Sequence, residues 1–275
     1  MTSVTGQRAR VAAPVIGGRS PGDAGALRRV ALSVMPLLVT VAVWELIVRL
    51  GIVKALFLPA FSSVLWKFWE ILVTGELLSH FKITVGRMLL GYVIGAGGAV
   101  AFGLAIGLSA PLRLFFSPLI AATYPLPKIA LLSLFLVIFG IGNAPIVASI
   151  VASAMYPVLL NTITGILAVD PILIRAARNL GANRFQVTTK VVLPGALPII
   201  FGGLRMGAAV SLIVVVAVEM YIAQSGVGYL LAWATEFFKT DLLYANLMAI
   251  GIFGIVVFKA LDVLERWALP WNPEK

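Results

Sequence analysis

Long apolar stretches constrain this chain more than any other feature of its sequence. Several such stretches run almost free of charge, and 61% of the 275 residues are hydrophobic while 12% are charged. An apolar helix of about 20 residues crosses the hydrocarbon core of a bilayer. A transmembrane strand would instead need segments of about ten alternating residues. The sequence therefore predicts an all-α, polytopic membrane protein with about six transmembrane helices.

The six predicted spans set the domain organisation. They cover residues 30–50, 81–108, 119–139, 146–167, about 197–222 or 203–222, and 242–261. Residues 1–29 carry five arginines against one acid and are predicted to be a disordered tail. Residues 30–270 form the transmembrane domain, and residues 271–275 form a short C-terminal tail.

The distribution of cations gives the orientation of these spans. An even number of spans places both termini on one side, together with the basic segment 170–194. Cations collect in cytoplasmic loops, so both termini are predicted to be cytoplasmic. The net charge of +10 follows from this sidedness, and binding of nucleic acid is not needed to explain it.

Between the spans the sequence predicts three local features. Trp66 and Trp69 favour an amphipathic helix at the outer interface, capped by Ser62 and Ser63, with a buried soluble helix as the alternative. Residues 109–118 and 223–241 are predicted to be loops. Arg87 is expected to extend its charge toward the outer interface.

Small residues recur every four positions in the second span and favour close packing of another helix against them. These residues are Gly91, Gly95, Ala99, Gly103 and Gly107.

Polar groups at membrane depth indicate a candidate translocation path. The third span is interrupted at residues 124–128, where two prolines break the hydrogen-bond ladder, which is tolerated only against protein or a wet cavity. The path candidates are Tyr124, Lys128, Asn161 and Glu219. The alternative for each is a hydrogen bond between helices.

Signatures of enzymatic chemistry are missing from the sequence. It contains no P-loop, no H-E-x-x-H and no G-x-S-x-G motif. It has no cysteine, and His80 is its single histidine, which is too few for a multi-histidine metal site. We therefore expect no catalytic residue, no metal site and no cofactor in this chain.

The segment from residue 170 to residue 194 is predicted to form a basic helical hairpin. Pro171 can open a first helix, and Gly181 can end it in the left-handed conformation. Asn183 can cap a second helix, and the pair Leu193-Pro194 is expected to end the segment. From these residues alone, a solvated charged loop without a partner remains an alternative.

The spacing within this segment resembles the EAA motif of ABC-importer permeases. Arg175-Ala176-Ala177 is followed by three residues and Gly181, and nine more residues lead to the sequence Val-Val-Leu-Pro at 191–194. Arg175 stands where the motif has Glu, and Val191 where it has Ile. The chain is similar to the nitrate, sulfonate, taurine and bicarbonate branch over about residues 55–262. That wider likeness rests on Pro127, Phe139-Gly140-Ile141-Gly142, Gly203-Leu204-Arg205, Val218-Glu219-Met220 and Ser225-Gly226-Val227-Gly228-Tyr229.

The resemblance implies the transmembrane domain of a type I importer in a bacterial plasma membrane, which moves a small anionic solute such as a sulfonate, taurine or nitrate. It implies two cytoplasmic ATPase subunits that hold ATP and Mg²⁺, a second permease copy in a homodimer, and a periplasmic or lipid-anchored solute-binding protein. Secondary transport without an ATPase is the alternative function, although no inverted repeat is evident. A purely structural membrane subunit is a third.

The resemblance also assigns the residues that contact the ATPase. Among them, Ala177, Leu180 and Gly181 are expected to tolerate substitution least. The full set is Arg175, Ala176, Ala177, Arg178, Leu180, Gly181, Leu193 and Pro194.

Overall fold

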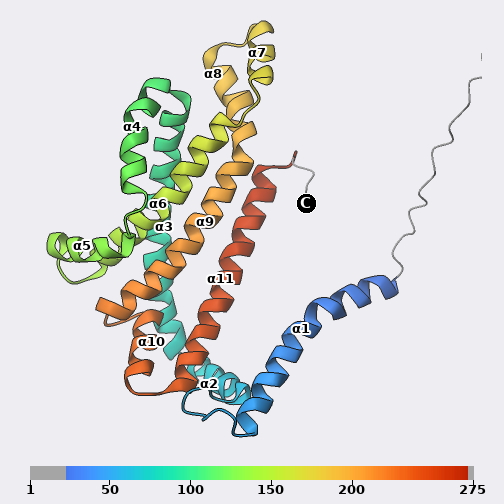
Figure 1. The fold of residues 1–275 in the computed structure, drawn as a ribbon, viewed down its shortest axis with the longest axis vertical. Helices are drawn as coiled ribbons and strands as arrows, with labels where there is room; N and C mark the ends of the chain where they lie inside the picture. The colour runs from blue at the N-terminus through green and yellow to red at the C-terminus, as the bar shows by residue number, and fades with distance from the viewer. Residues whose placement is uncertain (1–22, 272–275) are drawn as a thin grey trace, which may run out of the picture.

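The computed structural model describes residues 23–271, and every regular element in that part of the chain is helical (Figure 1). The all-α prediction is therefore confirmed. In chain order the elements are α1 (Asp23–Arg49), α2 (Phe61–Val73), α3 (Glu76–Leu108), α4 (Ala110–Thr123), the 3₁₀ turn η1 (Lys128–Ala130), α5 (Leu131–Phe139), α6 (Asn143–Leu167), α7 (Pro171–Asn179), α8 (Arg184–Val187), the π turn η2 (Thr188–Val192), α9 (Leu193–Ile222), α10 (Val227–Glu236) and α11 (Thr240–Ala268).

Four helices of the described part are long and apolar enough to cross a membrane. They are α3, α6, α11 and the continuous helix of 39 residues from Arg184 to Ile222 that joins α8 to α9. The pair formed by α4 and residues 128–139, bent by 80°, makes a fifth if it counts as one span. The first predicted span, α1, is not among these helices. Within the described residues the structure thus gives four such helices, or five with the bent pair, and the number of six spans and the sidedness of the termini stay predictions.

The helices α3, α6 and α9 form the centre of the fold. α6 packs along both α3 and α9, and α11 lies beside α9 (Figure 1). Arg205 on α9 forms ion pairs with Asp262, at 2.6 Å, and with Glu265 on α11. The short helices α7 and α8 lie at one end of the molecule, called the hairpin end below. The opposite end, called the far end, carries α2 and α10 (Figure 1).

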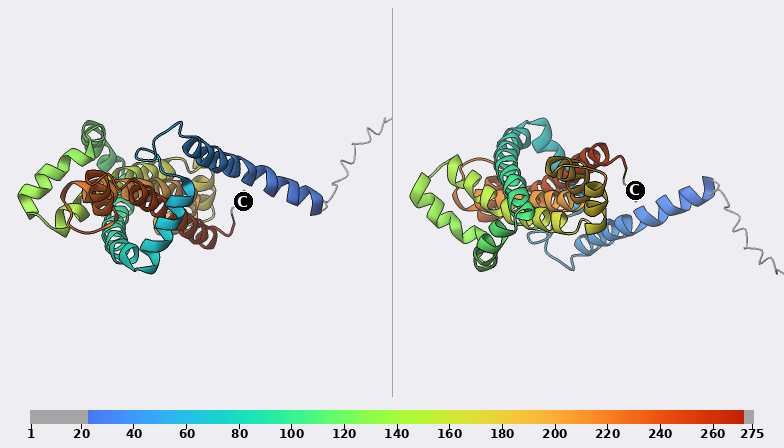
Figure 2. Two further views of the ribbon diagram at one scale, coloured as in Figure 1. Left: turned by 90° about the horizontal axis from the view of Figure 1, so that it is seen from below. Right: turned by 90° about the horizontal axis from the view of Figure 1, so that it is seen from above.

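The helix α1 stands away from the other helices over most of its length (Figure 2). It meets them near its C-terminal end, where Trp44 donates a hydrogen bond from Nε1 to the carbonyl of Pro59 at 3.0 Å. Its start at Asp23 falls inside the segment predicted to be a disordered tail. The sequence explains this start, because residues 24–29 are mostly alanine, leucine and arginine, which have high helix propensity. Residues 1–22 of that tail and residues 272–275 of the C-terminal tail lie outside the described part.

The regularly spaced small residues of α3 pack against α6, as predicted. A Cβ atom added to Gly95 would lie 2.8 Å from the carbonyl oxygen of Val151. One added to Gly103 would lie 2.7 Å from the Cβ atom of Thr162. Since real Cβ atoms do not approach other atoms so closely, any larger residue at these positions would force α3 and α6 apart.

Two predicted loops are helical in the structure. Residues 110–118 belong to α4, because Ser109 caps the helix and accepts a hydrogen bond from the N–H of Leu112 at 3.5 Å. Pro111 lies in the first turn, where a proline is tolerated. The segment 223–241 likewise contains α10. Short helices between spans carry too few residues for their periodicity to be recognised in the sequence.

The two serines predicted to cap α2 do not cap it. The N-cap residue is Ala60, which makes no side-chain cap, so Ser62 and Ser63 lie inside the first turn. Ser62 instead binds Glu45 of α1, donating from its backbone N–H at 3.1 Å and from Oγ at 2.8 Å. The partner of Ser62 is thus the carboxylate of Glu45 on another helix, and not the N–H groups at the start of α2.

The close approach of α3 and α6 is open to a direct test. Gly95→Ala is expected to destabilise the protein by about 1–3 kcal/mol, because the added methyl group meets backbone that cannot move easily. For a chain of this size the thermal midpoint should fall by several degrees, measured on purified protein in detergent. Gly97→Ala on the same helix is the matched control, since nothing lies within 4 Å of its added Cβ. Equal midpoints for the two variants would contradict this packing.

Candidate functional site

The segment from 170 to 183 folds into a capped hairpin at the hairpin end. Asp170 opens α7 by accepting a hydrogen bond on Oδ1 from the N–H of Ile172 at 2.7 Å. Gly181 follows α7 with a φ of +86°, a conformation that other residues rarely adopt. The chain closes around it through a hydrogen bond from the N–H of Ala182 to the carbonyl of Ala177 at 3.0 Å. The predicted opening of this helix by Pro171 and its end at Gly181 are confirmed.

The second half of the hairpin begins with a capping box. The N–H of Gln186 donates to Oδ1 of Asn183, and the N–H of Asn183 donates to Oε1 of Gln186, both at 2.9 Å. Asn183 therefore caps α8, as predicted. Two orphan N–H groups at the helix start are satisfied at once, which fixes the direction in which α8 leaves the turn.

The segment does not end at Leu193-Pro194, contrary to the prediction. The helix passes through a π turn at residues 188–192 and continues as α9. In this wider turn the N–H of Leu193 donates to the carbonyl of Thr188. Pro194 falls in the first turn after it, where its missing N–H is tolerated. The hairpin is thus joined rigidly to a membrane-spanning helix.

The hairpin has a buried inner side and an exposed outer side. Val187 and Val192 are buried and pack with Val169 and Ala196, and Ala177 packs against this cluster half-buried. The outer side, called the hairpin face below, mixes large apolar side chains with cations and leaves Leu180 89% exposed. Its exposed residues are Ile172, Leu173, Arg175, Ala176, Arg178, Leu180, Gly181, Arg184 and Phe185.

The predicted coupling residues divide between these two sides. Arg175, Ala176, Arg178, Leu180 and Gly181 are on the hairpin face. The remaining three are half-buried within the protein: Ala177, Leu193 and Pro194. Ala177 therefore supports the hairpin from inside, and Phe185, which the sequence did not single out, extends the exposed apolar surface.

Two predicted path residues meet where the third span breaks. Lys128 donates from Nζ to the carbonyls of Thr123, Tyr124 and Leu126, each at 2.8 Å. Its ammonium group also lies 4.0 Å from the centre of the Tyr156 ring. All three ammonium donors are therefore used by carbonyl groups at the break between the two helices. The lysine stabilises the break between α4 and α5.

The other two predicted path residues lie elsewhere. Asn161 donates from Nδ2 to the carbonyl of Pro157 at 2.8 Å and lies where α6 meets α9, since a Cβ on Gly203 would be 2.5 Å from its own. Glu219 is fully buried at the far end. The structure brings Tyr124 and Lys128 together and places Asn161 and Glu219 apart from them and from each other.

The carboxylate of Glu219 forms a buried ion pair with Arg87, whose Nη1 lies 2.7 Å from Oε1. Arg87 also donates from Nη1 to the carbonyl of Ser225 at 2.7 Å and from Nε to Oδ1 of Asn143 at 2.8 Å. Its side chain is 10% exposed, so it does not extend to the interface, contrary to the prediction. A carboxylate of α9 holds its guanidinium group inside the protein instead.

Four further donors complete this ion-pair network. Thr84 donates from Oγ1 to Oε2 of Glu219 at 2.8 Å, and the N–H of Gly228 donates to the same oxygen at 3.1 Å. Thr84 in turn accepts from the N–H of Val227 at 2.8 Å. His80 accepts from the N–H of Gly226 on Nδ1 at 3.0 Å. The network joins α3, α9 and the start of α10.

The glycines beside Glu219 leave room for its carboxylate. A Cβ atom on Gly226, whose φ is +116°, would lie 2.4 Å from both carboxylate oxygens. One on Gly228 would lie 2.4 Å from the carbonyl oxygen of Val216. The two glycines of the Ser-Gly-Val-Gly sequence at 225–228 could have indicated a close contact here. That sequence gives no indication that Arg87 is the partner of Glu219.

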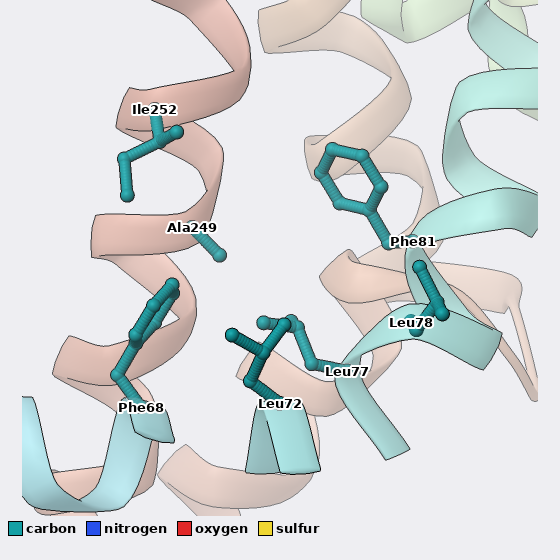
Figure 3. Close-up of a pocket in the computed structure, with 7 residues that line it drawn as sticks. All are labelled: Phe68, Leu72, Leu77, Leu78, Phe81, Ala249 and Ile252. Atoms are coloured by element: carbon teal, nitrogen blue, oxygen red, sulfur yellow. The ribbon is translucent and has the colours of Figure 1, made fainter. Parts of the chain in front are cut away.

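An apolar recess lies between α2, α3 and α11. Figure 3 shows its lining side chains converging from the three helices, and all of the atoms they contribute are carbon. They are Phe68, Leu72, Leu77, Leu78, Phe81, Ala249 and Ile252. Its volume is about 180 Å³. A charged solute would lose its hydration there without gaining a hydrogen-bond partner, so the recess is unsuited to an anion.

Known sequences match the chain over most of its length. The profile of a family described as "Binding-protein-dependent transport system inner membrane component" matches residues 91–270. The taurine transport system permease protein TauC of Escherichia coli is 34% identical, over 90% of this chain and 92% of its own. The aliphatic sulfonates transport permease protein SsuC of Bacillus subtilis is 33% identical, over 85% of each chain.

Two solved structures share the fold. One belongs to an amino acid ABC transporter and matches 74% of this chain and 98% of its own, with a TM-score of 0.54 and 20% identity. The other belongs to the MetNI methionine ABC transporter and matches 76% of this chain and 98% of its own, with a TM-score of 0.53 and 21% identity. The arrangement of helices described above is therefore that of an ABC transporter membrane domain.

The buried ion pair predicts strongly non-additive substitutions. Arg87→Met or Glu219→Met alone leaves one charge buried without its partner and should destabilise the protein by about 3–5 kcal/mol. The double variant removes both charges and should lie much closer to the wild type than the sum of the two losses. Yield and thermal midpoint of the four proteins measure this.

The exposed pair Lys67–Glu70, 3.0 Å apart, provides the control. Lys67→Met and Glu70→Met should each change stability by less than about 1 kcal/mol and add without coupling. Additive losses at Arg87 and Glu219 would show that the two charges do not stabilise one another.

Proposed function

Because the chain belongs to the family of binding-protein-dependent transport system inner-membrane components, we propose that it imports a small sulfonate-bearing solute and couples to a separate ATPase through its hairpin face. As a member of this family it is a multi-pass membrane protein and the permease subunit of an ABC importer. It works with an ATPase and a solute-binding protein, and ATP hydrolysis is not its own activity. This assignment replaces the alternative of a secondary transporter.

The observation that carries the coupling proposal is the exposure of the hairpin face. Leu180 is 89% and Phe185 is 75% exposed, and the same face carries three exposed arginines. Large apolar side chains beside cations are typical of a surface that a partner covers. Buried Val187 and Val192 fix this surface to the helix of 39 residues that ends at Ile222. A partner that moves the hairpin therefore also moves α9.

The names of the relatives support the proposed class of solute. Taurine and aliphatic sulfonates, which the names of two relatives give as their substrates, both carry a small anionic sulfonate group. Within this chain the best candidate for an anion contact was Lys128, whose ammonium donors are already used by three carbonyls. We infer that selectivity for the solute depends mainly on the binding protein.

The proposed assembly follows the family. Two copies of this chain form a homodimer around the path in a bacterial plasma membrane. Two ATPase subunits, which hold ATP and Mg²⁺, meet the two hairpin faces from the cytoplasm. A periplasmic or lipid-anchored binding protein delivers the solute to the far end. The chain itself binds no cofactor in this scheme.

Reconstitution in proteoliposomes with the cognate ATPase and binding protein tests the proposed function. Radiolabelled taurine or ethanesulfonate should enter only when the binding protein is outside the vesicle and ATP is inside it. Uptake by the permease alone would instead support secondary transport. ATP-dependent uptake of neither solute, but of another anion, would retain the importer and overturn the proposed solute.

Leu180→Asp tests the hairpin face directly. Since the side chain touches little of its own protein, the variant should fold and insert normally. A charge in an apolar contact should reduce ATP-driven uptake by at least tenfold and release the ATPase on purification. Trp271→Asp is the control, because Trp271 is also exposed and lies just beyond the end of α11, outside the hairpin face. Wild-type uptake by Leu180→Asp would remove the hairpin face from the coupling path.

A further inference from the structure

A second groove lies on the side of the molecule formed by α3, α4 and α6. Its volume is about 510 Å³, and it is distinct from the recess of Figure 3. Its walls are mainly isoleucine and leucine. The residues that line it are Ile106, Arg113, Ser117, Ile120, Ala121, Tyr124, Leu160, Ile163 and Leu167.

Arg113 is the one charged residue among those that line this groove. It lies in the second turn of α4, near the hairpin end (Figure 1). One guanidinium nitrogen, Nη1, donates to the carbonyl of Gly107 at 3.1 Å, which holds the side chain over the C-terminal end of α3. Among the described residues the structure gives its other N–H groups no partner. A fixed cation therefore faces the groove with donors left to use.

The length of the groove corresponds to one leaflet of a bilayer. Arg113 and Tyr124 are eleven residues apart on α4 and its C-cap, which is about 16 Å along a helix. The hydrocarbon core of a bilayer is about 30 Å thick. With Arg113 at the level of the headgroups, the groove would therefore reach to about the middle of the membrane.

We propose that this groove binds an anionic phospholipid of the inner leaflet, with its phosphate on Arg113 and an acyl chain along the wall formed by Ile120 and Ile163. Basic pockets between transmembrane helices on the cytoplasmic side bind anionic headgroups. The apolar wall takes the acyl chain, and the guanidinium takes two phosphate oxygens in its planar fork. Neither part of the groove alone would select such a ligand.

The proposed site can be tested on the full-length permease by measuring which lipids remain bound to it. The protein is purified from nanodiscs of equal parts dioleoyl phosphatidylglycerol and dioleoyl phosphatidylcholine, and the lipids that stay bound are counted by native mass spectrometry. The wild type should retain phosphatidylglycerol preferentially. Arg113→Gln should lower that preference about fivefold, the effect of one cation near the membrane surface. Arg266→Gln, which removes an exposed cation in the last turn of α11, should leave it unchanged.

A second pair of variants tests the acyl-chain wall. Ala121→Trp fills the groove and should reduce retention of both lipids at this site. Ala122→Trp places the same ring at the next residue, which does not line the groove, and should have no effect. An unchanged preference in Arg113→Gln, or unchanged retention in Ala121→Trp, would overturn the proposal. Loss of the permease dimer in Ala121→Trp, without loss of lipid, would assign the groove to a second copy of the chain instead.

Discussion

The buried ion pair between Arg87 and Glu219 is the interaction on which the far end of this fold depends. Glu219 has no exposed surface, so its charge is stable only because Arg87, Thr84 and the N–H of Gly228 surround it. Arg87 and Thr84 come from α3, and Gly228 comes from the start of α10. The carboxylate therefore determines how α3, α9 and the start of α10 meet, and a buried charge allows few alternative arrangements.

Between the ion pair and the hairpin end, close contacts between helices hold α3, α6 and α9 together. Glycines of α3 lie against α6, and Gly203 and Gly207 of α9 also lie against α6. Lipid tails are as apolar as the side chains, so the hydrophobic effect does not hold helices together within a membrane. Contacts between helices there depend on close van der Waals packing. Small residues allow such packing because they let the backbones of two helices approach closely. At the hairpin end, buried valines replace glycines and hold the hairpin to α9.

The sequence predicted the features that local chemistry determines. Pro171, Gly181 and Asn183 each act through their own backbone or nearest neighbours, and all three behave in the structure as the sequence indicates. The proline break after Thr123 and the small-residue spacing of α3 were equally readable. Two of the wrong predictions share one cause, which is a partner distant in the sequence. Arg87 lies 132 residues from Glu219, and Ser62 lies 17 residues from Glu45. No local sequence pattern predicts such a pairing, and the roles predicted for Arg87 and Ser62 were therefore wrong.

The uninterrupted helix from Arg184 to Ile222 has a mechanical consequence. At 1.5 Å per residue its 39 residues extend about 58 Å, with the hairpin at one end and the ion pair of Glu219 at the other. Between these ends, Gly203 and Gly207 press against α6 near Pro157 and Val158. The helix thus resembles a lever resting on a fulcrum near its middle. A tilt about that contact moves the two ends in opposite directions by similar amounts, so closing on one side of the membrane and opening on the other become one motion.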